Sequence, residues 1–149
     1  MNPEQWSYTH TWAADPTHVS RARAFVSTHL TLHGLTDVVP DAQLVVSELA
    51  TNAVMHTGTP FTVTVERRDH TVTLQVSDQS PDLPHMAGRS ADLQTSGLGL
   101  HVVHDISDAW GVTSDPSGGK SVWASFVVVA PDAAPSRAVA TGVQVGPRA

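Results

Sequence analysis

The sequence predicts an α+β fold, a two-layer sandwich in which helices cover one face of a mixed, mostly antiparallel sheet. Two observations support this prediction. Segments whose apolar residues alternate with a period of two are interspersed with segments of helical spacing, in the order β-α-α-β-β-α-β. In addition, a short turn joins two consecutive strands, which must therefore pair antiparallel.

The first half of the chain predicts one strand and two helices. Residues 6–12 alternate with a period of two and indicate a half-buried strand. Asp15-Pro16 is a helix start signal, and that helix is expected to stop near Gly34. Pro40-Asp41 starts a second helix, which we expect to run to about Met55-His56. The residues that share one face of the strand are Trp6, Tyr8, His10 and Trp12.

A hairpin and a long loop follow. Strands are expected at residues 61–66 and 71–78, joined by a turn at 67–70. Residues 79–96 are polar and rich in turn formers. A loop of this length inside a compact domain is usually functional or mobile.

The end of the domain predicts one more helix and one more strand. Gly97 opens a helix that is expected to reach about Trp110, and residues 121–129 form an apolar strand. One domain therefore spans residues 1–130. Residues 131–149 show no periodicity and predict a disordered tail.

Composition excludes several classes of function. The chain has 0 Cys, which rules out a disulfide framework, a Cys-based zinc site and thiol catalysis. Lys+Arg is 8 against 14 Asp+Glu, a net charge of −6, so direct binding of nucleic acid or an anionic membrane is not expected. No apolar run approaches the roughly 18 residues of a membrane span, and the N-terminus has no secretory signal. We therefore expect a cytoplasmic protein.

The second helix carries two polar residues four positions apart. Glu48 and Asn52 lie on one face of a helix that is otherwise mostly apolar. A charged residue there costs free energy unless it is paired or faces a polar cleft. One interpretation is a general base at Glu48 and an amide oxygen at Asn52 for Mg²⁺, which prefers oxygen ligands. The alternative is a Glu–Asn hydrogen bond at a helix surface.

Two further motifs have both a functional and a structural interpretation. Asp78 ends its strand on the side of the apolar residues, where an exocyclic amine such as that of adenine would supply a donor; alternatively it caps the turn at 78–81. Gly97 and Gly99 precede a helix and allow backbone amides to approach phosphate oxygens, although they also suit an ordinary helix entry. Residues 118–121 contain Gly-Lys-Ser but precede a strand, which excludes a Walker-type loop.

Together these motifs resemble the Bergerat, or GHKL, ATP-binding family, which includes gyrases and histidine kinases. Residues 48–56 resemble the family's N box, and residues 97–100 its glycine box. Residues 78–81, in the form Asp-x-Ser-Pro, resemble the aspartate box of actinobacterial anti-sigma factor serine/threonine kinase-like regulators. Residues 119–124 resemble the closing strand of that subgroup. The resemblance covers roughly residues 10–129.

The resemblance implies a role for each matching position. Glu48 would be the catalytic base, and Asn52 would hold Mg²⁺. Asp78 would bind the adenine amine, which Ser121 would support through water. Residues 79–96 would form the ATP lid. Arg89 lies in this segment and would take the place of the family's arginine near the γ-phosphate if the lid closes; the alternative is a solvated loop arginine. The other positions implied to contact ATP are His56, Gly97, Leu98, Gly99 and Leu100.

Two departures from the family pattern bear on catalysis. Ser80 and Asp82 replace two glycines that often follow the family's aspartate. Kinase members commonly have an arginine shortly before the glycine box, where this chain has Gln94-Thr95-Ser96. A missing cation weakens the electrostatic stabilisation that phosphoryl transfer requires.

The resemblance implies an ATP-dependent regulator. Such a protein would transfer the ATP γ-phosphate to a hydroxyl of an anti-sigma antagonist protein of the STAS type, sequester a sigma factor, or do both. One alternative is an ATP-binding interaction module without kinase activity, and another is an α+β binding domain that binds no nucleotide. Relatives suggest a homodimer. The nine histidines are interpreted as scattered surface residues, and the aromatic face of the first strand as packing or a dimer contact.

Overall fold

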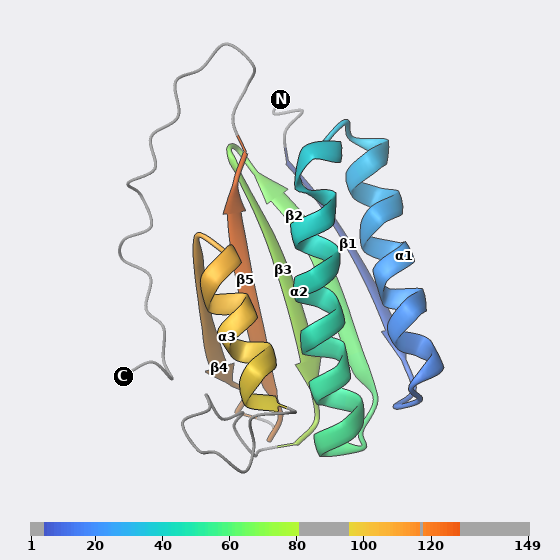
Figure 1. Cartoon of the computed structure of the whole chain (residues 1–149). Coiled ribbons are helices and arrows are strands. Elements are labelled where there is room, and N and C mark those ends of the chain that lie inside the picture. Colours follow the sequence, from blue (N-terminus) through green and yellow to red (C-terminus); the bar gives the residue numbers. More distant parts are fainter. Residues whose placement is uncertain (1–4, 81–95, 117, 129–149) are drawn as a thin grey trace.

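The computed structural model describes residues 5–80, 96–116 and 118–128. Its strands form one sheet in the order β1-β2-β3-β5-β4. Figure 1 shows that the three α-helices cover the same face of this sheet. The predicted tail, and the predicted lid apart from its first two residues and its last, lie outside the described residues. The elements are β1 (Gln5–Trp12), α1 (Thr17–Leu32), η1 (Thr36–Val38), α2 (Val39–Asn52), η2 (Ala53–Thr57), β2 (Phe61–Arg68), β3 (Thr71–Asp78), α3 (Ser96–Ile106), β4 (Ala109–Ser114) and β5 (Lys120–Val127).

The two-layer α+β prediction is confirmed, but the pairing of the described strands is antiparallel throughout. The difference from a mixed sheet is due to β4, a strand that the sequence pattern did not predict. Without β4, helix α3 would connect β3 to a parallel neighbour, as in a crossover unit. Because β4 reverses the chain once more, β5 runs antiparallel to β3.

The predicted end of the third helix at Trp110 is wrong, because α3 ends at Ile106. Asp108 fixes the chain to β5 immediately after the helix. Its backbone N–H donates to the Ser125 carbonyl at 2.9 Å, and its carboxylate accepts from the Val127 N–H at 2.7 Å. Trp110 is therefore the second residue of β4, buried beneath the helices.

The core lies between the sheet and the helices. Inward-facing residues of β2, β3 and β5 alternate with residues on the opposite sheet face, which is rich in serine and threonine. On that face, hydroxyl pairs join β1 and β2, with 2.7 Å between Thr11 and Thr62. No helix among the described residues is long and apolar enough to cross a membrane. The largest fully buried side chains are Phe61, Leu30, Leu74 and Leu100.

Aromatic and histidine rings fill the space between β1 and α1. Trp6 stacks on His33, and Tyr8 stacks on His29 with 3.8 Å between ring centroids. The Tyr8 hydroxyl also lies 2.8 Å from Nε2 of His33. The packing interpretation of this strand face is confirmed, since Trp6, Tyr8 and Trp12 pack against the core. His29 and His33 are thus packing residues, in contrast to the interpretation of scattered surface histidines.

His29 makes stability depend on pH. Burial lowers the pKa of His29, and the charge of His33 acts in the same direction. Nδ1 of His29 finds no hydrogen-bond partner among the described residues. The folded state therefore favours the neutral ring, and its contribution to stability is complete above about pH 6.5 and is lost as the pH falls through the lowered pKa.

We expect acidification from pH 7 to pH 5 to lower the urea midpoint, and His29→Gln to reduce this decrease. Urea unfolding, followed by circular dichroism at pH 7 and at pH 5, measures the change in the midpoint for each protein. His101→Gln is the matched control, because His101 is an exposed histidine on another helix. A His29→Gln protein with the full wild-type pH dependence would contradict the assignment.

Candidate functional site

The sequence motifs lie at one end of the two layers. Helix α2 and strand β3 end there, at Asn52 and Asp78, while α3 and β5 begin there, at Ser96 and Lys120. Figure 1 shows these four ends together at the bottom of the molecule. The topology therefore brings the N box, the aspartate box and the glycine box to one location.

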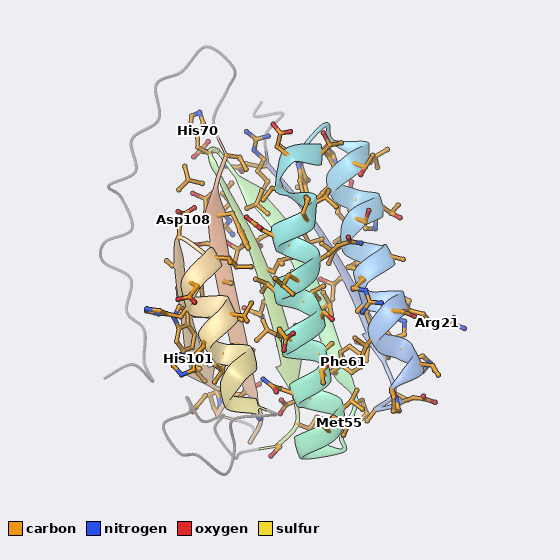
Figure 2. All side chains as sticks on the ribbon, viewed as in Figure 1. Arg21, Met55, Phe61, His70, His101 and Asp108 are labelled. Atoms are coloured by element: carbon orange, nitrogen blue, oxygen red, sulfur yellow. The ribbon has the colours of Figure 1, made fainter. Side chains whose placement is uncertain are left out.

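The positions of individual side chains show that the ends of α2 and β3 lie close to each other. Phe61 lies directly opposite Asp78 in the sheet register and is fully buried. Figure 2 places Phe61 at the same end of the molecule as Met55, which belongs to η2 and is 64% exposed. His70 and Asp108 lie at the opposite end. The C-terminal end of α2 and the end of β3 thus border the same edge of the core.

Glu48 and Asn52 are half-buried on α2, one helical turn apart. Leu49 and Ala50, on the same turn, are buried in the core and fix the helix against the sheet. Among the described residues, neither polar side chain makes a hydrogen bond or an ion pair. The surface Glu–Asn hydrogen bond, which was the alternative interpretation, is therefore not formed.

Helix α2 widens into a π-helical turn, η2, immediately after Asn52. Gly58 ends this turn with φ of +67°, and its N–H donates to the Ala53 carbonyl at 3.2 Å. Glycine suits this left-handed position because it has no Cβ. The helical segment thus ends at Thr57, close to the predicted end at Met55-His56, and only the backbone of His56 is described. Single π-helical turns of this kind are often found at functional sites.

Asp78 is paired with Lys120, a residue for which the sequence motifs indicated no role. Nζ of Lys120 lies 3.0 Å from Oδ1 of Asp78 and 2.9 Å from Oδ2. The Ser80 N–H also donates to Oδ1 at 2.9 Å, which is the capping geometry considered from the sequence. The Lys120 and Asp78 side chains are only 5% and 6% exposed. Both partners are therefore held in a buried ion pair at the edge of the core.

Ser121 is not brought together with Asp78. It pairs with Ser77, and the two hydroxyl oxygens lie 2.7 Å apart on the sheet face turned away from the helices. Lys120, one residue earlier, faces the helices and lies directly opposite Asp78. The signal available from the sequence was that Lys120 is the only lysine in the chain, at the first residue of an apolar strand.

Gly119 sets the distance between β5 and the end of β3. A Cβ at this position would overlap the carbonyl oxygen of Asp78 and lie 3.1 Å from Cα of Gln79. The carbonyl of Gly119 accepts from the Asp115 N–H at 2.7 Å, which closes the turn before β5. Only glycine, which has no side chain, allows β5 to lie this close to the end of β3. This close approach places Lys120 beside Asp78.

Gly97, Leu98, Gly99 and Leu100 lie in the first two turns of α3. The structure describes the backbone of the first three, while the side chain of Leu100 is fully buried in the core. Leu100 thus contributes packing that fixes the start of the helix. The first N–H groups of a helix lack partners within it and favour anions. Arg89 lies outside the described residues.

Comparison with known families identifies the domain. A family model described as a histidine kinase-like ATPase domain matches residues 12–126. The chain belongs to this family. The match runs from the last residue of β1 to the penultimate residue of β5. It therefore includes the N box, the aspartate box and the glycine box. A search of curated proteins finds no match.

The oxygen ligands in the described part of this histidine kinase-like ATPase domain suit a Mg²⁺ ion that is bound together with a nucleotide. Within the described ranges, no group of three or more His, Cys, Asp or Glu side chains could hold a metal ion. Mg²⁺ bound with a nucleotide needs few protein oxygens, because phosphates and waters supply the remaining ligands. The Asn52 amide oxygen, which has no partner in the described part of the chain, would supply one oxygen of this kind.

Proposed function

We propose that this protein binds Mg²⁺–ATP and regulates a protein partner as a serine/threonine kinase. It would transfer the γ-phosphoryl group to a hydroxyl of an anti-sigma antagonist of the STAS type, sequester a sigma factor, or do both, in the cytoplasm. The observation that supports this most is the position of Glu48, Asn52 and Asp78 at one end of a histidine kinase-like ATPase domain.

Each site residue has a role that its chemistry supports. When bound, Mg²⁺–ATP supplies the phosphoryl group that is transferred. Asp78 accepts a hydrogen bond from the adenine amine, and Asn52 provides an amide oxygen for the metal. Glu48, one helical turn before Asn52 and without a protein partner in the described residues, accepts the proton of the attacking hydroxyl. The N-terminal amides of α3 bind phosphate oxygens.

A second candidate function is an ATP-binding interaction module without kinase activity. It is favoured by the sequence before the glycine box, Gln94-Thr95-Ser96, which lacks the arginine common in kinase members. Both proposals require the same nucleotide site and a protein partner, and both allow a homodimer. They differ in whether the γ-phosphoryl group leaves ATP.

Calorimetric titration with ATP, with and without Mg²⁺, tests the nucleotide site. We expect binding that strengthens in the presence of Mg²⁺, because the ion bridges the phosphates and the Asn52 amide. Asn52→Ala is expected to remove most of this Mg²⁺ dependence. Gln75→Ala is the matched control, since Gln75 carries the same amide on the sheet face turned away from the helices.

Two outcomes would contradict these assignments. A wild-type protein that binds no ATP at millimolar concentration would remove the nucleotide from the proposed function. An Asn52→Ala protein with the wild-type Mg²⁺ dependence would remove Asn52 from the metal site while leaving the nucleotide site in place.

A further inference from the structure

Lys120 has a hydrogen-bond donor to spare in a buried position. Its ammonium group carries three N–H donors. At most two of them reach Asp78, whose two carboxylate oxygens lie 3.0 and 2.9 Å from Nζ. Within residues 5–80, 96–116 and 118–128, no other acceptor contacts Nζ. At least one N–H therefore remains available for water or a ligand, in a side chain that is 5% exposed.

Asp78 has an acceptor position to spare beside that donor. An ionised carboxylate offers about four lone-pair sites. Oδ1 accepts from the Ser80 N–H and from Lys120, whereas among the described residues Oδ2 accepts from Lys120 alone. The buried pair thus presents an unused acceptor on Oδ2 next to an unused donor on Nζ. A ligand that offers a donor and an acceptor on adjacent atoms would satisfy both.

The six-membered ring of adenine has such an edge, because its exocyclic amine is a donor and the neighbouring ring nitrogen N1 is an acceptor. We propose that Lys120 donates a hydrogen bond to N1 of adenine while Asp78 accepts from the amine. The proposal rests on the proposed ATP-binding function and adds a second base-reading residue to it. Lys120 then selects 6-aminopurine nucleotides through N1, and Gly119 places it there by allowing β5 to approach Asp78 closely.

The test compares ATP with 1-deaza-ATP, in which a C–H group replaces N1, by calorimetry on the full chain. In the wild-type protein we expect 1-deaza-ATP to bind about tenfold to a hundredfold more weakly than ATP, as for a lost hydrogen bond to a charged donor. The nucleotide 7-deaza-ATP keeps N1 and is expected to bind like ATP. In Lys120→Met, which removes the donors and keeps the length of the side chain, ATP and 1-deaza-ATP should bind equally.

Arg68→Met is the matched control, because it removes a 73% exposed cation from the sheet and should keep the wild-type preference for ATP. A second measurement does not depend on any variant. Since Lys120 is the only lysine, ¹⁵N-lysine labelling gives a single Nζ resonance. We expect this resonance to shift on addition of ATP and to shift far less on addition of 1-deaza-ATP at saturation.

The outcomes separate this proposal from the proposed function. If all three nucleotides bind the wild-type protein equally, Lys120 does not read N1 and this proposal is wrong, while ATP binding stands. The same conclusion follows if Lys120→Met keeps the wild-type preference for ATP. If none of the three nucleotides binds, the proposed function fails and this proposal fails with it.

Discussion

Replacing Lys120 with methionine is expected to lower the free energy of unfolding by about 3–5 kcal/mol. The variant leaves the Asp78 carboxylate buried without its cation, and an unpaired buried charge is costly. The side chains of both partners are nearly inaccessible, and their atoms lie 2.9–3.0 Å apart, so little water can replace the lost ammonium group. Urea unfolding followed by tryptophan fluorescence measures the change.

Two further variants make this prediction specific. The double variant Asp78→Asn/Lys120→Met removes both charges and is expected to recover most of the loss, because no unpaired charge remains. Arg68→Met removes a surface cation that lies 3.8 Å from Glu66, and its effect is expected to stay within about 1 kcal/mol. If Lys120→Met were as stable as the wild-type protein, the ion pair would be hydrated in solution rather than buried.

Replacing Glu48 with glutamine is expected to slow phosphoryl transfer by about 10²–10⁴-fold while ATP affinity stays nearly unchanged. Glutamine keeps the size and polarity of the side chain but cannot accept a proton from the attacking hydroxyl. Transfer of labelled phosphate from ATP to candidate STAS-type antagonist proteins, in a single turnover, measures the rate. Calorimetry with ATP on the same preparations measures the affinity.

Glu66→Gln is the matched control for this experiment. Glu66 is a partly exposed carboxylate on β2, opposite Thr73 on the sheet face turned away from the helices. Its replacement should change neither rate nor affinity. Equal transfer by Glu48→Gln and the wild-type protein would exclude Glu48 as the base. If both bind ATP and neither transfers phosphate to any candidate, the interaction module without kinase activity is favoured.

Most of the fold follows from local pattern, because its signals are confined to single elements. The period-two alternation of residues 61–66 and 71–78 and the start signals at Asp15 and Pro40 lie close to the observed element bounds. Strand β4 was missed because its six residues follow α3 after only Ser107 and Asp108. A short apolar run at a helix end has no period of its own that separates it from the helix.

The missed strand also explains why Lys120 could not be placed from the sequence. Lys120 and Asp78 are 42 positions apart, and their contact depends on the antiparallel register of β3 with β5. That register exists only because β4 reverses the chain before β5. Glu48 and Asn52, in contrast, are related by helical spacing alone, so the sequence sufficed to place them on one face.

The burial of the single lysine has a consequence for the chemistry of the intact protein. Acylating and alkylating reagents attack the uncharged amine, and in the folded state the side chain of Lys120 is only 5% exposed and is bound to a carboxylate. Its modification therefore requires that the ammonium group first separate from the Asp78 carboxylate and lose its proton. The rate at which this amine reacts thus reports how often the ion pair between Lys120 and Asp78 opens, without any label introduced by mutation.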